Sequence, residues 1–435
     1  MSQTVPDVNF FARETLDCPY HDYKKLRDEA PVWLDPVTGW YVLTRYDDIR
    51  AAILDTKRFT NRVGNGAGNT DKKISSLDPE KAKELLEALA MEEKIGQLFE
   101  EKGWPPAPSL DGRDEPEHMQ MRRMFDKAFR PSRIKDLDPY VETLAGRLID
   151  AFIGAGRCEW VNQFAVPLPL YTIGHQMGMP EEDMPKIKRW TDAWIKRMGL
   201  MQSPEDRYRS AELEVDAQHY FQPRFDRLRR EPDGTLLSDL VNTEIPEWGR
   251  TLTDNELHAE MMADLFVGGS ETTTNALAGG MVLLIEHPDV WAKLSSDPDR
   301  YLDTFVEEVL RLESPVQGLL RETGEEIELH GVKIPAGSVV VLRYAAGNRD
   351  ERRYDRPEEI DLERNQPRTH LAFGVGTHHC LGAPLARREL YFGFKAVVER
   401  FEELWFVDGA NDFRIVPQYF LRALQELHIG FTARA

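Results

Sequence analysis

The sequence predicts a mainly α-helical protein with small β-sheets, and three observations lead to this class. From residue 115 to residue 249, apolar side chains recur at three- and four-residue spacing, which is typical of helices. Residues 252–287 form the longest helical candidate, which a capping box at Thr253 and Glu256 opens and Pro288 ends. Strand-like patterns occur only in short stretches near both ends of the chain.

The predicted elements follow one another without a repeat or a Gly/Ser-rich linker, so we expect a single domain over residues 1–435. The first elements are a helix, two strands of a hairpin and a short helix, over 20–28, 32–34, 40–44 and 47–54. A long, partly helical surface insertion over 61–114 follows, with a charged helix over 79–102. The later elements are a helix over 298–313, strands over 325–329 and 338–342, an irregular stretch over 348–373, a last helix over 383–401 and strands within 414–431.

Composition limits the function classes. Hydrophobic residues make up 41% and charged residues 30%, which fits a globular protein with a sizeable core. The net charge of -20 argues against general affinity for nucleic acid or anionic membranes. The three cysteines are odd in number and far apart, so no disulfide framework is implied. Since no signal peptide and no run of about 18 apolar residues is evident, we expect a cytoplasmic protein without a membrane anchor.

The segment from Phe373 to Gly382, FGVGTHHCLG, contains the most informative motif. Its glycines permit tight turns and a close approach of backbone to a flat ligand. Cys380 precedes a predicted helix with Pro384 in its first turn, and helix N-terminal amides favour a thiolate. The segment matches F-G-x-G-x-H-x-C-x-G, so the chain resembles the cytochrome P450 superfamily. That resemblance implies a triangular, helix-rich prism around a buried haem b, with Cys380 as the iron ligand and Phe373, Gly374 and Gly382 beside the haem.

Two further motifs resemble those of the same superfamily. Glu308 and Arg311 match E-x-x-R and would share one helix face, and the resemblance adds Arg364 as a third, structural member. The stretch from Gly268 to Thr272, GGSET, places two glycines inside the long helix at a cost of about 1 kcal/mol each. By the resemblance, Thr272 hydrogen-bonds the iron-bound oxygen species and Glu271 relays protons to it. The alternative is close helix packing at the glycines beside a solvated Glu271.

The remaining haem contacts are also implied by the resemblance. His118 and Arg122 match the H-x-x-x-R helix that binds a haem propionate, and Arg321 and His378 match further propionate contacts. Cationic donors, arginine above all, are the partners that two carboxylates need. A surface ion pair is the alternative for His118.

By position, a substrate pocket would include Leu265, Gly268, Val316, Leu319 and Phe420, together with the insertion over 61–114 as a roof. The pocket residues are mostly apolar, which indicates a hydrophobic small-molecule substrate, although the same side chains also fit an ordinary core. No flavin or nicotinamide motif is present, so electrons would come from a separate partner, an iron–sulfur ferredoxin and its reductase. A basic patch would steer such an acidic partner: Arg122, Arg123, Lys127, Arg130, Arg387 and Arg388.

The function that we predict is therefore haem-thiolate monooxygenation, with insertion of one oxygen atom from O2 into a hydrophobic molecule. Three alternatives remain open. A peroxide-driven peroxygenase on the same fold would not need the acid–threonine pair, and a haem-bound sensor or carrier would need no redox partner. A zinc site built from His378, His379 and Cys380, or a buried structural Cys380, is the more remote alternative.

Overall fold

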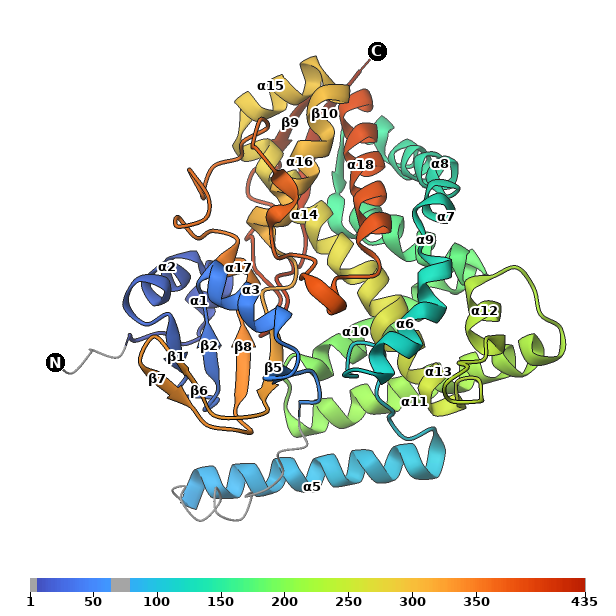
Figure 1. Cartoon of the computed structure of the whole chain (residues 1–435). Helices are drawn as coiled ribbons and strands as arrows, with labels where there is room; N and C mark the ends of the chain where they lie inside the picture. The colour runs from blue at the N-terminus through green and yellow to red at the C-terminus, as the bar shows by residue number, and fades with distance from the viewer. Residues whose placement is uncertain (1–5, 64–78, 435) are drawn as a thin grey trace.

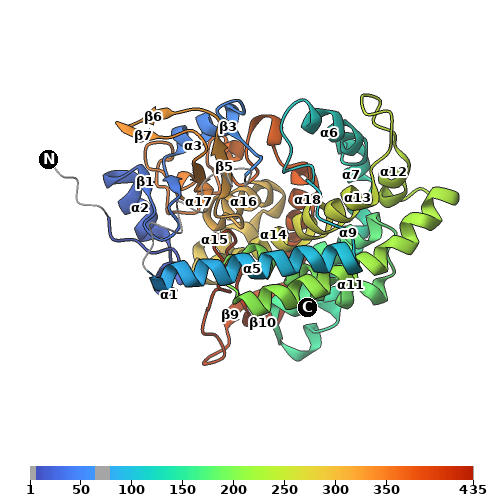
Figure 2. The ribbon, with the colours of Figure 1, turned by 90° about the horizontal axis from the view of Figure 1, so that it is seen from below.

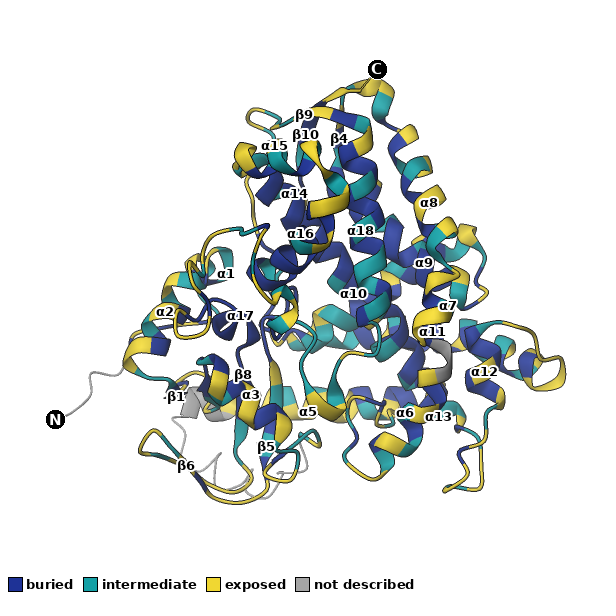
Figure 3. Ribbon diagram, turned by 45° about the horizontal axis from the view of Figure 1, so that its top comes forward, coloured by how far each residue is buried: buried dark blue, intermediate teal, exposed yellow. Residues whose placement is uncertain are grey.

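The computed structural model describes residues 6–63 and 79–434, except for the side chains at 79–82, 84, 85, 127 and 128. Helices dominate, and they form a molecule of triangular outline with small sheets near one corner and at the apex (Figures 1 and 3). The predicted fold class is confirmed. Within these described residues, no helix is both long and apolar enough to cross a membrane.

The larger sheet joins the two ends of the chain. Its strands are β1 (Val32–Leu34), β2 (Tyr41–Leu43), β8 (Val339–Leu342), β5 (Leu319–Thr323) and β3 (Phe59–Thr60), in this order. The predicted hairpin β1–β2 is confirmed, and β2 pairs in parallel with β8. The strand β5 was missed, and the two strands expected over 325–329 and 338–342 do not pair with each other. Instead β6 (Ile327–Leu329) pairs with β7 (Val332–Ile334) because Gly331, at φ 78°, closes a tight hairpin there.

The middle of the chain is helical, with one exception. Its main helices are α6 (Glu117–Ala128), α7 (Pro131–Lys135), α8 (Asp138–Asp150), α9 (Pro167–Gln176), α10 (Met184–Met198), α11 (Pro204–Arg230) and α12 (Leu236–Asn242). The exception is β4 (Arg157–Glu159), which pairs with β10 (His428–Ala433) of the tail. Local spacing did not indicate this strand because its partner lies far away in the sequence.

The central helix is not a uniform α-helix, which corrects the prediction over 252–287. It consists of α13 (Asp254–Glu260), a π-helical segment η4 (Met261–Glu271) and α14 (Thr272–Glu286). The capping box at Thr253 is confirmed. Within and after η4, the Ser270 hydroxyl donates to Phe266 O (2.6 Å) and the Thr272 hydroxyl to Gly268 O (3.1 Å). These side chains compete for helix carbonyls just where two glycines reduce helix propensity, which favours the wider π turns.

The charged helix of the insertion is confirmed as α5 (Pro79–Lys102). It crosses the outside of the molecule beside α11 (Figures 1 and 2). Ile95, Leu98 and Phe99 bury themselves against Ala211 and Val215 of α11. Residues 64–78 of the insertion lie outside the described part of the chain.

The C-terminal part contains the cysteine segment. Its elements are α15 (Pro288–Ser296), α16 (Pro298–Glu313), α17 (Tyr344–Gly347), α18 (Ala383–Arg400), β9 (Phe401–Phe406) and β10. The last helix ends at Arg400 and continues directly into β9, a strand that the sequence pattern did not indicate. Buried faces of α14, α16 and α18 meet in one core cluster, which fixes the helix that follows Cys380 against the central helix.

Candidate active site

The cysteine segment is a closed loop that leads into α18. Gly374 and Gly376 have left-handed backbones (φ 63° and 71°), and the Cys380 amide donates to Phe373 O at 2.8 Å. The Cys380 side chain is exposed. Burial among the surrounding protein atoms raises the pKa of its thiol, while hydrogen bonds from the Gly382 and Ala383 amides lower it. These two amides therefore favour a thiolate at this position.

The four residues predicted to bind propionates lie together. The rings of His118 on α6 and His378 in the loop are 3.9 Å apart between centroids. Burial, and then the charges of His118, Arg321 and Arg122, lower the pKa of His378 to about 3. Arg122 also donates to Thr377 O (2.9 Å) and His379 O (2.7 Å), so it ties α6 to the loop. Positive charges that lie this close repel one another, and an anionic ligand would relieve that repulsion. The cluster is therefore suited to an anion.

Two neighbours complete this cluster. Asn61 Nδ2 lies 2.5 Å from His378 Nε2, and Glu115 Oε1 lies 3.2 Å from His118 Nδ1. Burial lowers the pKa of His118, and Glu115 raises it. Asn61 was missed because nothing in the sequence relates it to a histidine 317 positions away.

Glu308, Arg311 and Arg364 form one buried network. The Glu308 carboxylate accepts two hydrogen bonds from Arg311 (2.8 and 3.0 Å) and one from Arg364 (2.8 Å). The Asp361 amide donates to the same carboxylate at 2.9 Å, and Arg311 donates to Pro357 O at 2.6 Å. The network ties α16 to the irregular segment that precedes the cysteine loop.

Glu271 points toward α10 in this structure. Its Oε1 accepts a hydrogen bond from the Thr191 hydroxyl (3.0 Å) and lies 3.3 Å from Lys188 Nζ. Burial raises the pKa of Glu271, against the charge of Lys188. The sequence did not identify Lys188 or Thr191. Thr272 is half-buried, and its hydroxyl donates to Gly268 O.

The proposed pocket residues differ in exposure. Gly268 and Leu319 are exposed, the latter to 40%, and Val316 is half-buried. Leu265 and Phe420 are buried within core clusters. An exposed glycine in the middle of the central helix indicates open space beside it.

Comparison with known proteins decides the family. The family model described as cytochrome P450 matches residues 212–406. Cytochrome P450 CYP107DY1 of Priestia megaterium is 32% identical over 98% of this chain and 99% of its own length. The chain belongs to the cytochrome P450 family.

Two other similar proteins are named as monooxygenases, and a solved P450 structure shares the fold. A steroid C26-monooxygenase of Mycobacterium tuberculosis (strain CDC 1551 / Oshkosh) is 32% identical over 86% of this chain and 96% of its own. The monooxygenase PikC of Streptomyces venezuelae is 31% identical over 98% of this chain and 94% of its own. The solved structure of the P450 PksS from Bacillus subtilis 168 covers 98% of this chain and 100% of its own, with TM-score 0.82 at 28% identity. This P450 is an oxidoreductase of the haem monooxygenase class.

The basic patch predicted for this P450 is largely neutralised by ion pairs. Arg123 pairs with Glu247 at 2.5 Å, Arg388 with Asp138 at 2.7 Å and Arg387 with Glu307 at 2.7 Å. Arg122 binds the loop carbonyls, and Arg130 is exposed. The side chain of Lys127 lies outside the described residues.

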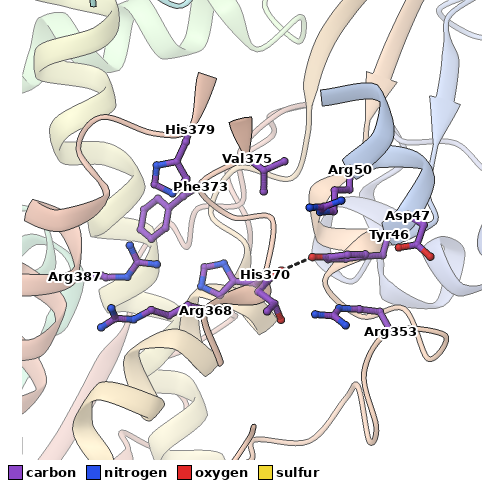
Figure 4. A pocket seen from close by; sticks show the side chains of 12 residues that line it. Tyr46, Asp47, Arg50, Arg353, Arg368, His370, Phe373, Val375, His379 and Arg387 are labelled. Carbon is purple, nitrogen blue, oxygen red and sulfur yellow. Dashed lines mark hydrogen bonds between the residues drawn. The ribbon is translucent and has the colours of Figure 1, made fainter. Parts of the chain in front are cut away.

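A second group of cations surrounds a pocket of about 440 Å³ beside the loop. In Figure 4, Arg368 and Arg387 lie on one side of this pocket and Arg50 and Arg353 on the other. Glu307 pairs with Arg387, and it also binds Arg368 (3.1 Å) and His370 (2.9 Å). Of these four arginines the sequence indicated only Arg387, because the four come from separate stretches of the chain.

The zinc alternative finds no support in the geometry of the described part of the chain, where no three His, Cys, Asp or Glu side chains are placed to hold a metal ion. Here the His378 ring contacts His118 and Asn61.

Proposed function

We propose that Cys380 is the axial thiolate ligand of a haem b in this P450. The observation that supports it is the pair of backbone amides, from Gly382 and Ala383, that is directed at the Cys380 thiol. The cluster of His118, Arg122, Arg321 and His378 offers two arginine cations and two imidazoles that can donate hydrogen bonds, which fits the two carboxylates of that group. A thiolate-bound haem iron supplies O2 activation and favours cleavage of the O–O bond.

The chain's own residues would control protons at this site. The Thr272 hydroxyl can donate a hydrogen bond toward the space beside Gly268. Glu271, whose raised pKa favours the protonated form, can deliver a proton once its carboxyl turns away from Lys188. The exchange of its contacts with Lys188 and Thr191 for a contact near Thr272 would be the conformational step of proton delivery.

The network around Glu308 would hold the cysteine loop in place. It fixes the segment over 355–364, which leads directly into the loop, and so positions Cys380 without touching the haem. Phe373, Gly374 and Gly382 would contact the haem face, because the loop brings its backbone close to the sulfur.

The first experiment is a spectrum of the purified, haem-loaded protein, reduced and exposed to carbon monoxide. We expect the red-shifted Soret band after which the family is named, and we expect Cys380→Ser to lose it. A wild-type band at the position typical of histidine ligation would contradict the assignment of Cys380.

The substrate that we propose is a hydrophobic small molecule. Steroids are a reasonable first panel, because one relative is a steroid C26-monooxygenase. A substrate should shift the ferric haem from low to high spin and be oxidised in the presence of O2 and an electron source. Oxidation with hydrogen peroxide alone, at an equal rate, would favour the peroxygenase alternative, and spin shifts without any oxidation would favour the carrier.

We propose an iron–sulfur ferredoxin, itself served by a reductase, as the electron donor. Arg50 and Arg353 line the pocket beside the loop and would attract an acidic surface of the partner protein. Arg387 lines the same pocket but is already paired with Glu307. Arg50→Glu with Arg353→Glu should slow reduction by about tenfold at low salt, and high salt should diminish the difference. Arg123→Glu, which removes an exposed and paired arginine, is the control and should change the rate less.

A further inference from the structure

Asn61 contacts the cluster proposed to bind the haem carboxylates, although it lies outside every motif of the family. It directly follows β3, and its Nδ2 lies 2.5 Å from His378 Nε2. The backbone amide of Asn61 donates to Asp114 Oδ1 at 2.8 Å, and Asp114 O accepts from the His118 amide at 2.9 Å. Asp114 therefore fixes the backbone of Asn61 relative to the start of α6, so the contact with His378 does not depend on the side chain of Asn61 alone.

The chemistry of this contact selects one form of the His378 ring. An amide nitrogen can only donate a hydrogen bond, so Nε2 must keep its lone pair and accept. The single proton of the ring then lies on Nδ1. With the amide turned over, Asn61 Oδ1 would accept from an Nε2–H instead, and Nδ1 would have no proton to donate.

Burial of the Asn61 amide favours the orientation in which its nitrogen faces His378. In this orientation Oδ1 is buried and has no hydrogen-bond partner among the described residues. Turning the amide over would bury two N–H groups at that place, and buried donors without a partner are rarer in proteins than carbonyl oxygens without one. The donating orientation therefore leaves the smaller deficit.

The second nitrogen of His378 is the one that a ligand can reach. Nδ1 has no hydrogen-bond partner within the described part of the chain, and unlike Asn61 Oδ1 it is not sealed inside the protein. The charges of Arg122 and Arg321 act on the same ring. A carboxylate beside Nδ1 would thus receive an N–H hydrogen bond in a positively charged surrounding.

We propose that Asn61 is a positioning residue of the haem site, which fixes His378 in the tautomer that donates from Nδ1 to a haem carboxylate. The inference rests on the proposed function, because haem supplies that carboxylate. Without Asn61 the ring would divide between two tautomers, of which only one can donate from Nδ1.

The tautomer is measured directly by 15N NMR of the histidine-labelled, haem-loaded protein. The protein is reduced and bound to carbon monoxide, because low-spin ferrous haem is diamagnetic. The signals of His378 are those that disappear in His378→Leu. We expect a protonated Nδ1 and an unprotonated Nε2 in the wild type, and a mixture of tautomers in Asn61→Leu. A protonated Nε2 in the wild type would overturn the inference, whether or not the variants fold.

Haem loss to an excess of apomyoglobin shows whether the tautomer matters for haem binding. We expect about tenfold faster loss from Asn61→Leu, as for one hydrogen bond to a charged group. Because Asn61 acts through His378, Asn61→Leu should add little to the effect of His378→Leu in the double variant. Asn255→Leu is the matched control, since Asn255 Nδ2 on α13 donates to a backbone carbonyl, Pro105 O, at 3.0 Å. This control should change neither the rate of haem loss nor the His378 signals.

Two further outcomes would overturn the inference. Equal rates of haem loss from the wild type and Asn61→Leu would mean that the tautomer does not contribute to haem binding. Additive effects of Asn61→Leu and His378→Leu would mean that Asn61 supports the site independently of His378. A missing red-shifted carbon monoxide band contradicts the proposed function instead, and the 15N spectrum then still reports the tautomer.

Discussion

Replacing Glu308 by Gln tests whether the buried network holds the cysteine loop. The substitution keeps size and shape but removes the one negative charge that faces Arg311 and Arg364. Both members of the Glu308–Arg311 pair are fully buried, so water cannot replace the lost interaction.

The hydrogen bonds around Glu308 set the expected magnitude. Breaking a buried pair by removing one partner costs about 3–5 kcal/mol. Arg311 would keep three carbonyl acceptors, Asn348 O (3.1 Å), Pro357 O (2.6 Å) and Glu359 O (2.9 Å). We therefore expect a loss at the lower end of this range, about 3 kcal/mol of unfolding free energy. Glu363→Gln is the matched control, because Glu363 pairs at 3.0 Å with Arg300, which lies on α16 like Glu308, but both side chains of this pair are exposed. The control substitution should cost about 0.5 kcal/mol of unfolding free energy or less.

The assay is urea unfolding of the haem-loaded protein, followed by tryptophan fluorescence and by the carbon monoxide band. In the Glu308→Gln protein the thiolate-ligated fraction should fall at lower urea than global unfolding, because the loop is released first. If Glu308→Gln lowered the unfolding free energy no more than Glu363→Gln, the network would not stabilise the protein as described. If both signals were lost together at the wild-type urea midpoint, the network would not hold the cysteine loop.

Three further outcomes are expected. Burial alone would raise the pKa of Glu307, but hydrogen bonds from His370 and Arg387 lower it to about 2. This carboxylate therefore adds stability above its ordinary pKa of 4.5 that is lost as the pH falls toward 2, and acid unfolding of Glu307→Gln should show a weaker pH dependence in that window. Thr272→Ala should consume electrons with less product, which a ratio of product to reductant would measure, and unchanged coupling would exclude a role for its hydroxyl. Lys188→Met should raise the pKa of Glu271 further, because it removes the charge that lowers it; a shift of the pH–rate profile to higher pH would show it, and Glu271→Gln should abolish that shift.

Local patterns predicted elements whose signals lie within a few residues. The capping box at Thr253, the hairpin β1–β2 and the charged helix α5 all appear where the spacing placed them. Strands β4 and β9 were missed, because each is three to six residues long and is stabilised by a partner strand that is distant in sequence. The π turns of η4 were missed as well, since they depend on hydroxyl–carbonyl bonds that periodicity does not report.

The sequence by itself determined the family, through a ten-residue loop motif around Cys380 and the order of the motifs near it. Motif spacing could do so because glycine turns, a helix start and an i,i+3 pair are local consequences of the chain. Only the tertiary structure decided which charges are free. It pairs Arg123, Arg387 and Arg388 with acids, turns Glu271 toward Lys188, and buries Glu260 beside Asp264. Charge pairing depends on distances between segments far apart in the chain, and folding alone sets those distances.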